Sequence, residues 1–178
     1  YAEKFIYDFY TSSHPFTPFI IGDLSDKIGL YHSNPKLYFI PKQHRLGKFN
    51  DLFGDKLYMV EERQSKEHID LESYGKPQDI IGTDEVLENI TKDEKYQVDE
   101  ASYIKARLFD MLIGDWDRHQ DQWRWSEFEK DGNIIYKPIP RDRDQAFAKP
   151  DGNLTSLLLN IPGARHITHF KATYPSEK

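Results

Sequence analysis

The sequence predicts an α+β fold that is mainly helical and carries a short β-hairpin, and three observations lead to this expectation. Apolar residues at spacings of three and four predict a helix over residues 99–113, broken at Gly114. Two alternating segments on either side of the turn EKDGN predict the hairpin. Two short runs rich in aromatic and apolar residues, 36–41 and 56–62, predict two further strands.

The helix over 99–113 should bury one apolar stripe against the rest of the protein. The stripe consists of Ala101, Ile104, Leu108, Met111 and Leu112.

Three more segments have helical signals. AEKFIYDFYTSS, near the beginning of the chain, has apolar residues at helical spacing. Thr17 and Pro18 should cap and start a second helix, which Gly29 should end. Thr83 should cap a third.

The hairpin should present Trp123 and Trp125 on one face, where we expect them to pack in the core. Its return strand contains Pro138 and Pro140, which predict an edge position or an early end. The strand leads into RDRDQAF, residues 141–147.

Composition narrows the function classes. The chain has 178 residues and 38% hydrophobic residues, enough for a buried core, and its net charge of −6 argues against nucleic acid as a partner. It has no cysteine, which excludes disulfides and zinc–thiolate sites. No apolar run reaches membrane-spanning length. Because the chain begins at Tyr1 rather than methionine, we expect it to be a fragment of a larger protein.

A polar cluster, GDWDRHQDQW, follows the helix over 99–113. The hairpin should fold the chain back so that Asp142 and Asp144 return near Asp115, Asp117 and Gln122. Two carboxylates about 4 Å apart repel by roughly 4 kcal/mol at an effective dielectric near 20, so a cation, arginine partners or a shared proton must offset the repulsion. Oxygen ligands from Asp and an amide suit Mg²⁺, Mn²⁺ or Ca²⁺, and a remaining aspartate can accept a proton from a hydroxyl group.

A structural interpretation stands beside this one. The cluster could cap the helix and form a network of salt bridges, with Arg141 and Arg143 paired to the loop aspartates and no metal bound. This interpretation fits Asp115 and Asp121 best, and neither is included among the candidate catalytic residues.

The motif DMLIGDWDRHQDQW…IPRDRDQAF resembles the catalytic core of atypical protein-kinase-like folds, among them phosphatidylinositol kinases, HipA-type toxin kinases, Golgi secretory kinases and CotH-type kinases. The resemblance implies a catalytic loop of Asp117, Arg118 and His119, in which Asp117 orients or deprotonates the acceptor hydroxyl and the other two brace the loop. It also implies that Gln122 and Asp142 hold the metal. Asp144 is the competing metal ligand, because the CotH-type pattern is Asp-x-Asp.

Nearly the whole chain also resembles a module of large Bacteroidetes-type proteins, where it accompanies a calcineurin-like metallophosphoesterase and sometimes a BamA-class outer-membrane barrel. The matching motifs are TSSHPF, NPKLYFIP…RLG, LYMVEER, ARLFDMLIGDWDRHQDQWRW and PIPRDRDQAF. The resemblance implies a location in the cell envelope and, as partners, the other domains of the parent protein.

The kinase resemblance divides the chain into residues 1–62, the remnant of a small N-terminal lobe with a hinge near LYMVEER, and residues 63–178, a C-terminal catalytic lobe. The glycine-rich loop and strand lysine of such folds are not found before the first helix. Glu3 would be the acidic partner of that lysine in the nucleotide site, and the lysine itself would lie upstream.

These implications lead to one main functional hypothesis and two alternatives. The main hypothesis is phosphate transfer from ATP to an unknown acceptor, with Mg²⁺ or Mn²⁺ as cofactor. The first alternative is a non-catalytic, pseudokinase-like accessory or binding module. The second, a metal-dependent phosphohydrolase, is less favoured because the histidines do not cluster with the carboxylates.

Overall fold

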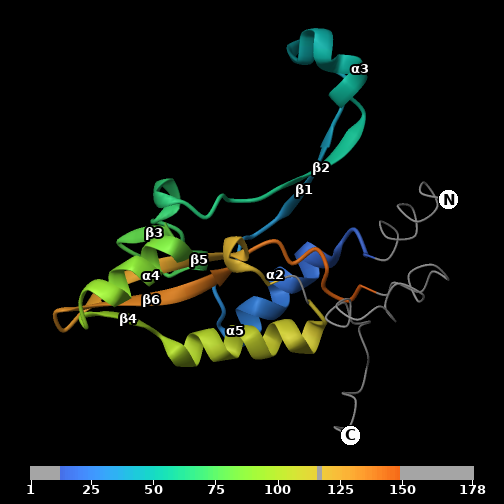
Figure 1. Cartoon of the computed structure of the whole chain (residues 1–178). Helices are drawn as coiled ribbons and strands as arrows, with labels where there is room; N and C mark the ends of the chain where they lie inside the picture. Colours follow the sequence, from blue (N-terminus) through green and yellow to red (C-terminus); the bar gives the residue numbers. More distant parts are fainter. Residues whose placement is uncertain (1–12, 116–117, 149–178) are drawn as a thin grey trace, which may run out of the picture.

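A computed structural model of the chain describes residues 13–115 and 118–148 (Figure 1). These residues form an α+β fold with a four-stranded sheet, a separate two-stranded ribbon and four α-helices. The prediction of a mainly helical fold was wrong, because strands at 79–82 and 96–98, which the sequence analysis missed, enlarge the hairpin into a sheet. Residues 1–12 of the predicted small lobe, which contain most of the first predicted helix, and residues 149–178 of the predicted large lobe lie outside the described residues.

The four-stranded sheet has the order β3-β5-β6-β4 and surrounds the predicted hairpin. Its strands are β3 (Asp79–Gly82), β4 (Tyr96–Val98), β5 (Trp123–Lys130) and β6 (Asn133–Pro140). β3 and β6 pair with β5 in antiparallel fashion, whereas β4 pairs with β6 in parallel. The turn of the hairpin, Asp131-Gly132, has positive φ at both residues, as a tight two-residue turn requires.

The prolines predicted that the return strand of the hairpin lies at an edge or ends early. Instead, β6 is a central strand and extends to Pro140. β4 pairs only with Ile134–Tyr136, in the first half of β6. Pro138 and Pro140 therefore fall beyond the stretch that pairs with β4, where a missing N–H costs no hydrogen bond to that strand.

Three helices pack with the sheet, and their bounds follow the sequence closely. They are α2 (Thr17–Ile28), α4 (Thr83–Lys92) and α5 (Glu100–Ile113). Gly29 and Gly114 end α2 and α5 in left-handed conformations, as predicted. α2 and α5 lie side by side below the sheet (Figure 1), and the Lys105 ammonium on α5 donates to the Ile28 carbonyl 3.1 Å away.

Two predicted helix caps were wrong. The N-cap of α2 is Phe16, and that of α4 is Gly82. Thr17 and Thr83 are instead the first helical residues. The Thr83 hydroxyl donates to the Gln120 carbonyl at 2.9 Å, so it ties α4 to the loop that follows α5.

The core lies between the sheet and the helices, and both hairpin tryptophans are buried in it, as expected. The prediction for the apolar stripe of α5 was wrong: Ile104, Leu108, Met111 and Leu112 are 56–59% exposed. The buried face carries other residues of the helix: Ala106, Phe109, Asp110 and Ile113.

β1 (Lys36–Ile40) and β2 (Lys56–Val60) are the two predicted short strands, and they pair with each other as an antiparallel ribbon. The ribbon extends away from the rest of the molecule, with α3 (Asn50–Phe53) at its tip (Figure 1). Residues 61–65 lead back from it to the sheet. Four short 3₁₀ helices complete the described elements: η1 (His44–Phe49), η2 (Lys66–His68), η3 (Glu72–Tyr74) and η4 (Gln120–Gln122).

Candidate functional site

The hairpin brings the polar loop after α5 next to the segment after β6. The backbone N–H of Arg141 donates to the Gln122 carbonyl at 2.9 Å. The guanidinium of Arg118 donates to the carbonyls of Arg141, at 2.6 Å, and of Asp142, at 3.0 Å. Two parts of the sequence that were predicted to meet are thus joined by backbone and side-chain hydrogen bonds.

Gln122 and Asp142 are in direct contact. The Gln122 amide nitrogen donates to a carboxylate oxygen of Asp142 at 3.2 Å. It also lies 3.3 Å from Nε2 of His119, which accepts the second amide proton when that ring nitrogen is unprotonated. Gln122 is buried and Asp142 is exposed, so the pair borders solvent.

Arg118 connects the polar loop to its surroundings through several side-chain contacts. Its side chain is only 1% exposed. It forms an ion pair with Asp115, and its Nε lies 3.8 Å from a carboxylate oxygen of Asp110. One buried guanidinium therefore joins the end of α5, the polar loop and the segment after β6.

A second buried arginine strengthens the same region. Arg143 donates to one carboxylate oxygen of Asp110 through two nitrogens, at 2.8 and 3.1 Å, and to the Ser25 hydroxyl at 3.2 Å. Its partner is a helix residue of α5, not a loop aspartate as the structural interpretation had it. Asp110, Asp115, Arg118 and Arg143 form a buried network of two negative and two positive side chains.

Asp115 has an unusual environment within this network. Burial raises the pKa of Asp115 to about 7, although the neighbouring Arg118 acts to lower it. Its second carboxylate oxygen, Oδ1, is buried and has no hydrogen-bond partner among the described residues. The contact with Arg118 thus compensates only part of the desolvation of this carboxylate.

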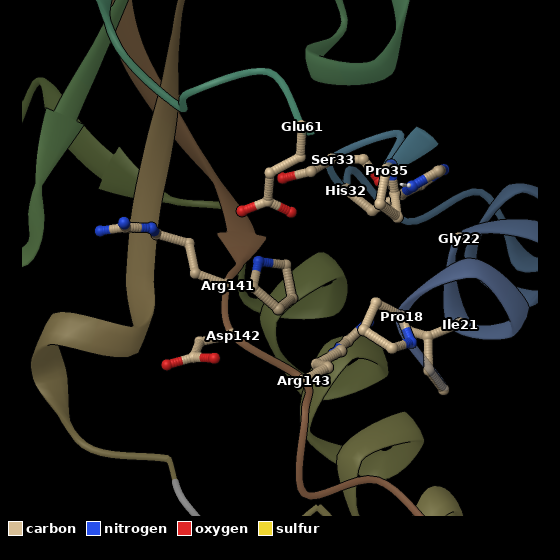
Figure 2. Close-up of a pocket in the computed structure, with 11 residues that line it drawn as sticks. Pro18, Ile21, Gly22, His32, Ser33, Pro35, Glu61, Arg141, Asp142 and Arg143 are labelled. Carbon is tan, nitrogen blue, oxygen red and sulfur yellow. Dashed lines mark hydrogen bonds between the residues drawn. The ribbon is translucent and has the colours of Figure 1, made fainter. Parts of the chain in front are cut away.

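A cavity lies beside Asp142. It is enclosed by α2, by the segments that enter and leave the two-stranded ribbon, and by the segment at the end of β6 (Figure 2). It is lined by Pro18, Ile21, Gly22, His32, Ser33, Pro35, Glu61, Pro140, Arg141, Asp142 and Arg143. Figure 2 shows the carboxylates of Glu61 and Asp142 at one end of it, with the backbone of Arg141 between them in this view.

The sequence analysis did not identify Glu61 as a site residue. Burial raises the pKa of Glu61, Arg141 opposes this rise, and the negative charge of Asp142 adds to it. The available signal was its position directly after β2, in the motif LYMVEER, which was interpreted as a hinge.

The described residues provide few metal ligands. Within 13–115 and 118–148, no three His, Asp or Glu side chains are grouped closely enough to hold a cation. Asp142 offers a carboxylate, Gln122 offers an amide oxygen only if the amide rotates, and Asp144 is exposed two residues further on. Asp117 and Glu3 lie outside the described residues, so their predicted roles stay predictions.

Comparison with known proteins adds no family to this description. The chain matches no protein-family model, and no significant match to a curated protein or a solved structure was found.

In the described part of the chain, no helix combines the length and the apolar character needed to cross a bilayer.

Proposed function

We propose that this chain belongs to a phosphotransferase that moves a phosphate group from ATP to an acceptor hydroxyl with the help of Mg²⁺ or Mn²⁺. The observation that carries this proposal is the contact between Gln122 and Asp142, 3.2 Å apart and directly beside the anchored Arg118. Asp117, the proposed base, directly precedes Arg118 in the sequence, and Arg118 donates to the carbonyl of Asp142, one of the proposed metal ligands.

Each residue has a distinct role in this proposal. Asp117 accepts the proton of the attacking hydroxyl, and Arg118 with His119 fixes the loop that carries it. Asp142 and Gln122, or alternatively Asp144, bind the cation, whose chemistry is to neutralise charge on the phosphate oxygens. Glu3 orients a nucleotide-binding lysine in the kinase-like lobe arrangement that the resemblance implies.

The test is phosphate transfer by the full-length parent protein. Asp117→Asn and Asp142→Asn should each lower the rate by roughly 100-fold or more, since each removes a charged group at the reacting centre. Asp121→Asn is the matched control, because Asp121 is exposed in the same loop and has no assigned role. Equal rates for Asp117→Asn and Asp121→Asn would refute the assignment of the base.

A second candidate function is a non-catalytic accessory module, and one observation favours it. The Gln122 amide already satisfies Asp142 with a hydrogen bond, and Gln122 is neutral where a carboxylate would bind a cation more strongly.

Thermal denaturation with and without Mg²⁺ or Mn²⁺, in the presence and absence of ATP, separates the two functions. A ligand that binds only the folded protein raises its melting temperature. A rise that requires both ATP and metal supports the phosphotransferase, and a rise with metal alone indicates a simple acidic site. No rise with any combination, measured on the full-length parent, supports the accessory module.

A further inference from the structure

A second cleft lies on the side of Arg141 that faces β5, away from the cavity of Figure 2. It is formed by the residues between β2 and η2, by the end of β3, and by the first residues of β5. Three arginines line it: Arg63, Arg124 and Arg141. Figure 2 shows the Arg141 side chain extending away from Pro18 and Ile21, which belong to the other cavity.

The positive charge in this cleft is only partly neutralised. Lys66, which also lines it, is paired with Asp79 at 2.5 Å. The guanidinium groups of Arg63 and Arg141, in contrast, make no hydrogen bond or ion pair with a side chain of the described residues.

Arg124 is oriented but retains free donors. Its guanidinium donates through one nitrogen to the Trp123 carbonyl at 2.8 Å and to the Asp121 carbonyl at 3.5 Å. Burial lowers the pKa of Arg124, and the positive charges of Arg141 and Arg63 lower it further, while Asp121 opposes this. The arginines are therefore close enough to repel one another, and a bound anion would relieve that repulsion.

Gly82 keeps the cleft open opposite Arg124. The two residues are directly paired across the β3–β5 ladder, so their side chains would share one face of the sheet. A Cβ atom at Gly82 would meet nothing within 4 Å. Its φ of −84° is accessible to every residue, so the position tolerates a side chain without backbone strain.

We propose that this cleft binds a phosphate dianion, either free or as the terminal group of a monoester, held by Arg63, Arg124 and Arg141. Guanidinium groups present paired N–H donors whose spacing matches phosphate oxygens, and three such groups around one cleft match a dianion. The proposal goes beyond phosphate transfer and does not depend on it, because it needs neither a metal nor a reaction.

The experiment measures binding of inorganic phosphate to the whole chain by titration calorimetry at low ionic strength, without divalent metal. Arg124→Gln and Arg141→Gln should each weaken binding roughly tenfold or more, as expected for the loss of a charge-assisted contact. Lys48→Gln, on the distant ribbon, should leave it unchanged.

Two variants at Gly82 form a matched pair that keeps the fold intact. Gly82→Asp places a carboxylate opposite Arg124 and should abolish phosphate binding. Gly82→Ser adds a smaller, uncharged side chain and should retain phosphate binding. Both supply a side-chain cap to α4 and should raise the melting temperature, which reports directly that the variants fold.

Saturable phosphate binding that Gly82→Asp abolishes and Gly82→Ser retains supports the proposal. Absence of saturable binding in the unmodified chain, or equal binding by both Gly82 variants, overturns it. If adenosine monophosphate binds more tightly than inorganic phosphate and loses that binding in Gly82→Asp, a nucleotide supplies the phosphate, whereas equal affinities indicate the free anion. If the chain binds phosphate but the full-length parent protein transfers none, the phosphotransferase proposal fails and the phosphate site stands.

Discussion

The amide nitrogen of Gln122 lies 3.2 Å from a carboxylate oxygen of Asp142, although 20 positions separate the two residues in the sequence. The hairpin explains this proximity. β5 and β6 have eight residues each, are joined by a two-residue turn and pair along their whole length. Gln122 directly before the hairpin therefore meets Arg141 directly after it, through a backbone hydrogen bond, and Asp142 is the next residue. Any change that shifts the register of this hairpin would separate them.

Gln122→Glu should make the stability of the protein depend on divalent metal. The variant places a second carboxylate beside Asp142, and without a cation the repulsion should lower the free energy of unfolding by on the order of 1–3 kcal/mol. Adding Mg²⁺ should restore most of this loss, which urea denaturation with EDTA or Mg²⁺ measures. Gln122→Met, which adds no charge, is the control. A loss in Gln122→Glu that Mg²⁺ leaves unchanged would contradict a cation site here.

Arg118→Ala should destabilise the protein strongly. The substitution leaves Asp115 without its cationic partner and two carbonyl groups without their donor, and the loss of one member of a buried ion pair typically costs about 3–5 kcal/mol. Arg118→Lys should recover only part of this, since an ammonium cannot reproduce the guanidinium geometry. Arg45→Ala, at an exposed position of η1, should change stability by less than about 0.5 kcal/mol. Similar midpoints of urea denaturation for Arg118→Ala and Arg45→Ala would disprove the bracing role.

Asp115 should make the protein less stable as pH rises from about 4 to about 7. Its pKa in the folded protein is about 7, above the value near 3.9 of an unfolded chain, so the folded state holds the proton more tightly between these limits. The stabilisation is complete below the lower value and is lost as pH approaches the upper one, at up to about 1.4 kcal/mol per pH unit.

Asp115→Asn should remove this slope, because an amide does not titrate. Urea denaturation of both proteins at several pH values gives the comparison. Parallel curves for the two proteins between pH 4 and 7 would show that Asp115 does not titrate in this range.

Thr83→Val should weaken the connection between α4 and the polar loop. The Thr83 hydroxyl donates to the Gln120 carbonyl and accepts from the Trp125 indole nitrogen at 3.1 Å, so valine leaves both groups without this partner. The expected loss of stability is about 1–3 kcal/mol. Thr83→Ser retains the hydroxyl and should lose less than half as much. Equal losses for both variants in thermal denaturation would assign the effect to packing instead.

Helix ends and the hairpin could be predicted from the sequence because their signals are local. The Asp99 carboxylate accepts from the backbone N–H of Ser102 at 3.0 Å, and Gly114 takes the left-handed conformation that stops a helix. The turn at Asp131-Gly132 is equally local. Each of these elements depends on residues within a few positions of one another.

The buried face of α5 could not be predicted in the same way, because the helix has apolar residues on two faces. Leu108 and Phe109 are neighbours in the sequence, yet Leu108 is 59% exposed and Phe109 only 6%. Hydrophobic periodicity cannot decide between two such faces. The face of α5 that is buried also carries Asp110, which pairs with Arg143, 33 positions away in the sequence.

The Gln122–Asp142 contact followed from the hairpin, whereas Glu61 and the arginine cleft did not. Glu61 and Arg63 both follow β2, so their positions depend on where the ribbon returns to the rest of the molecule. β3 joins the sheet by pairing with β5, from which it is distant in the sequence, and no local turn signal indicates this pairing. Such contacts depend on tertiary packing.

Asp142 has a φ of 50°, in the left-handed region, which glycine adopts without strain and aspartate adopts at a cost in free energy. Glycine would therefore relax the backbone at this position and at the same time delete the carboxylate that meets Gln122. A laboratory selection for heat resistance alone would accept glycine at position 142, whereas a selection for cation binding would reject it. The residue recovered from each selection would show whether Asp142 is kept for stability or for cation binding.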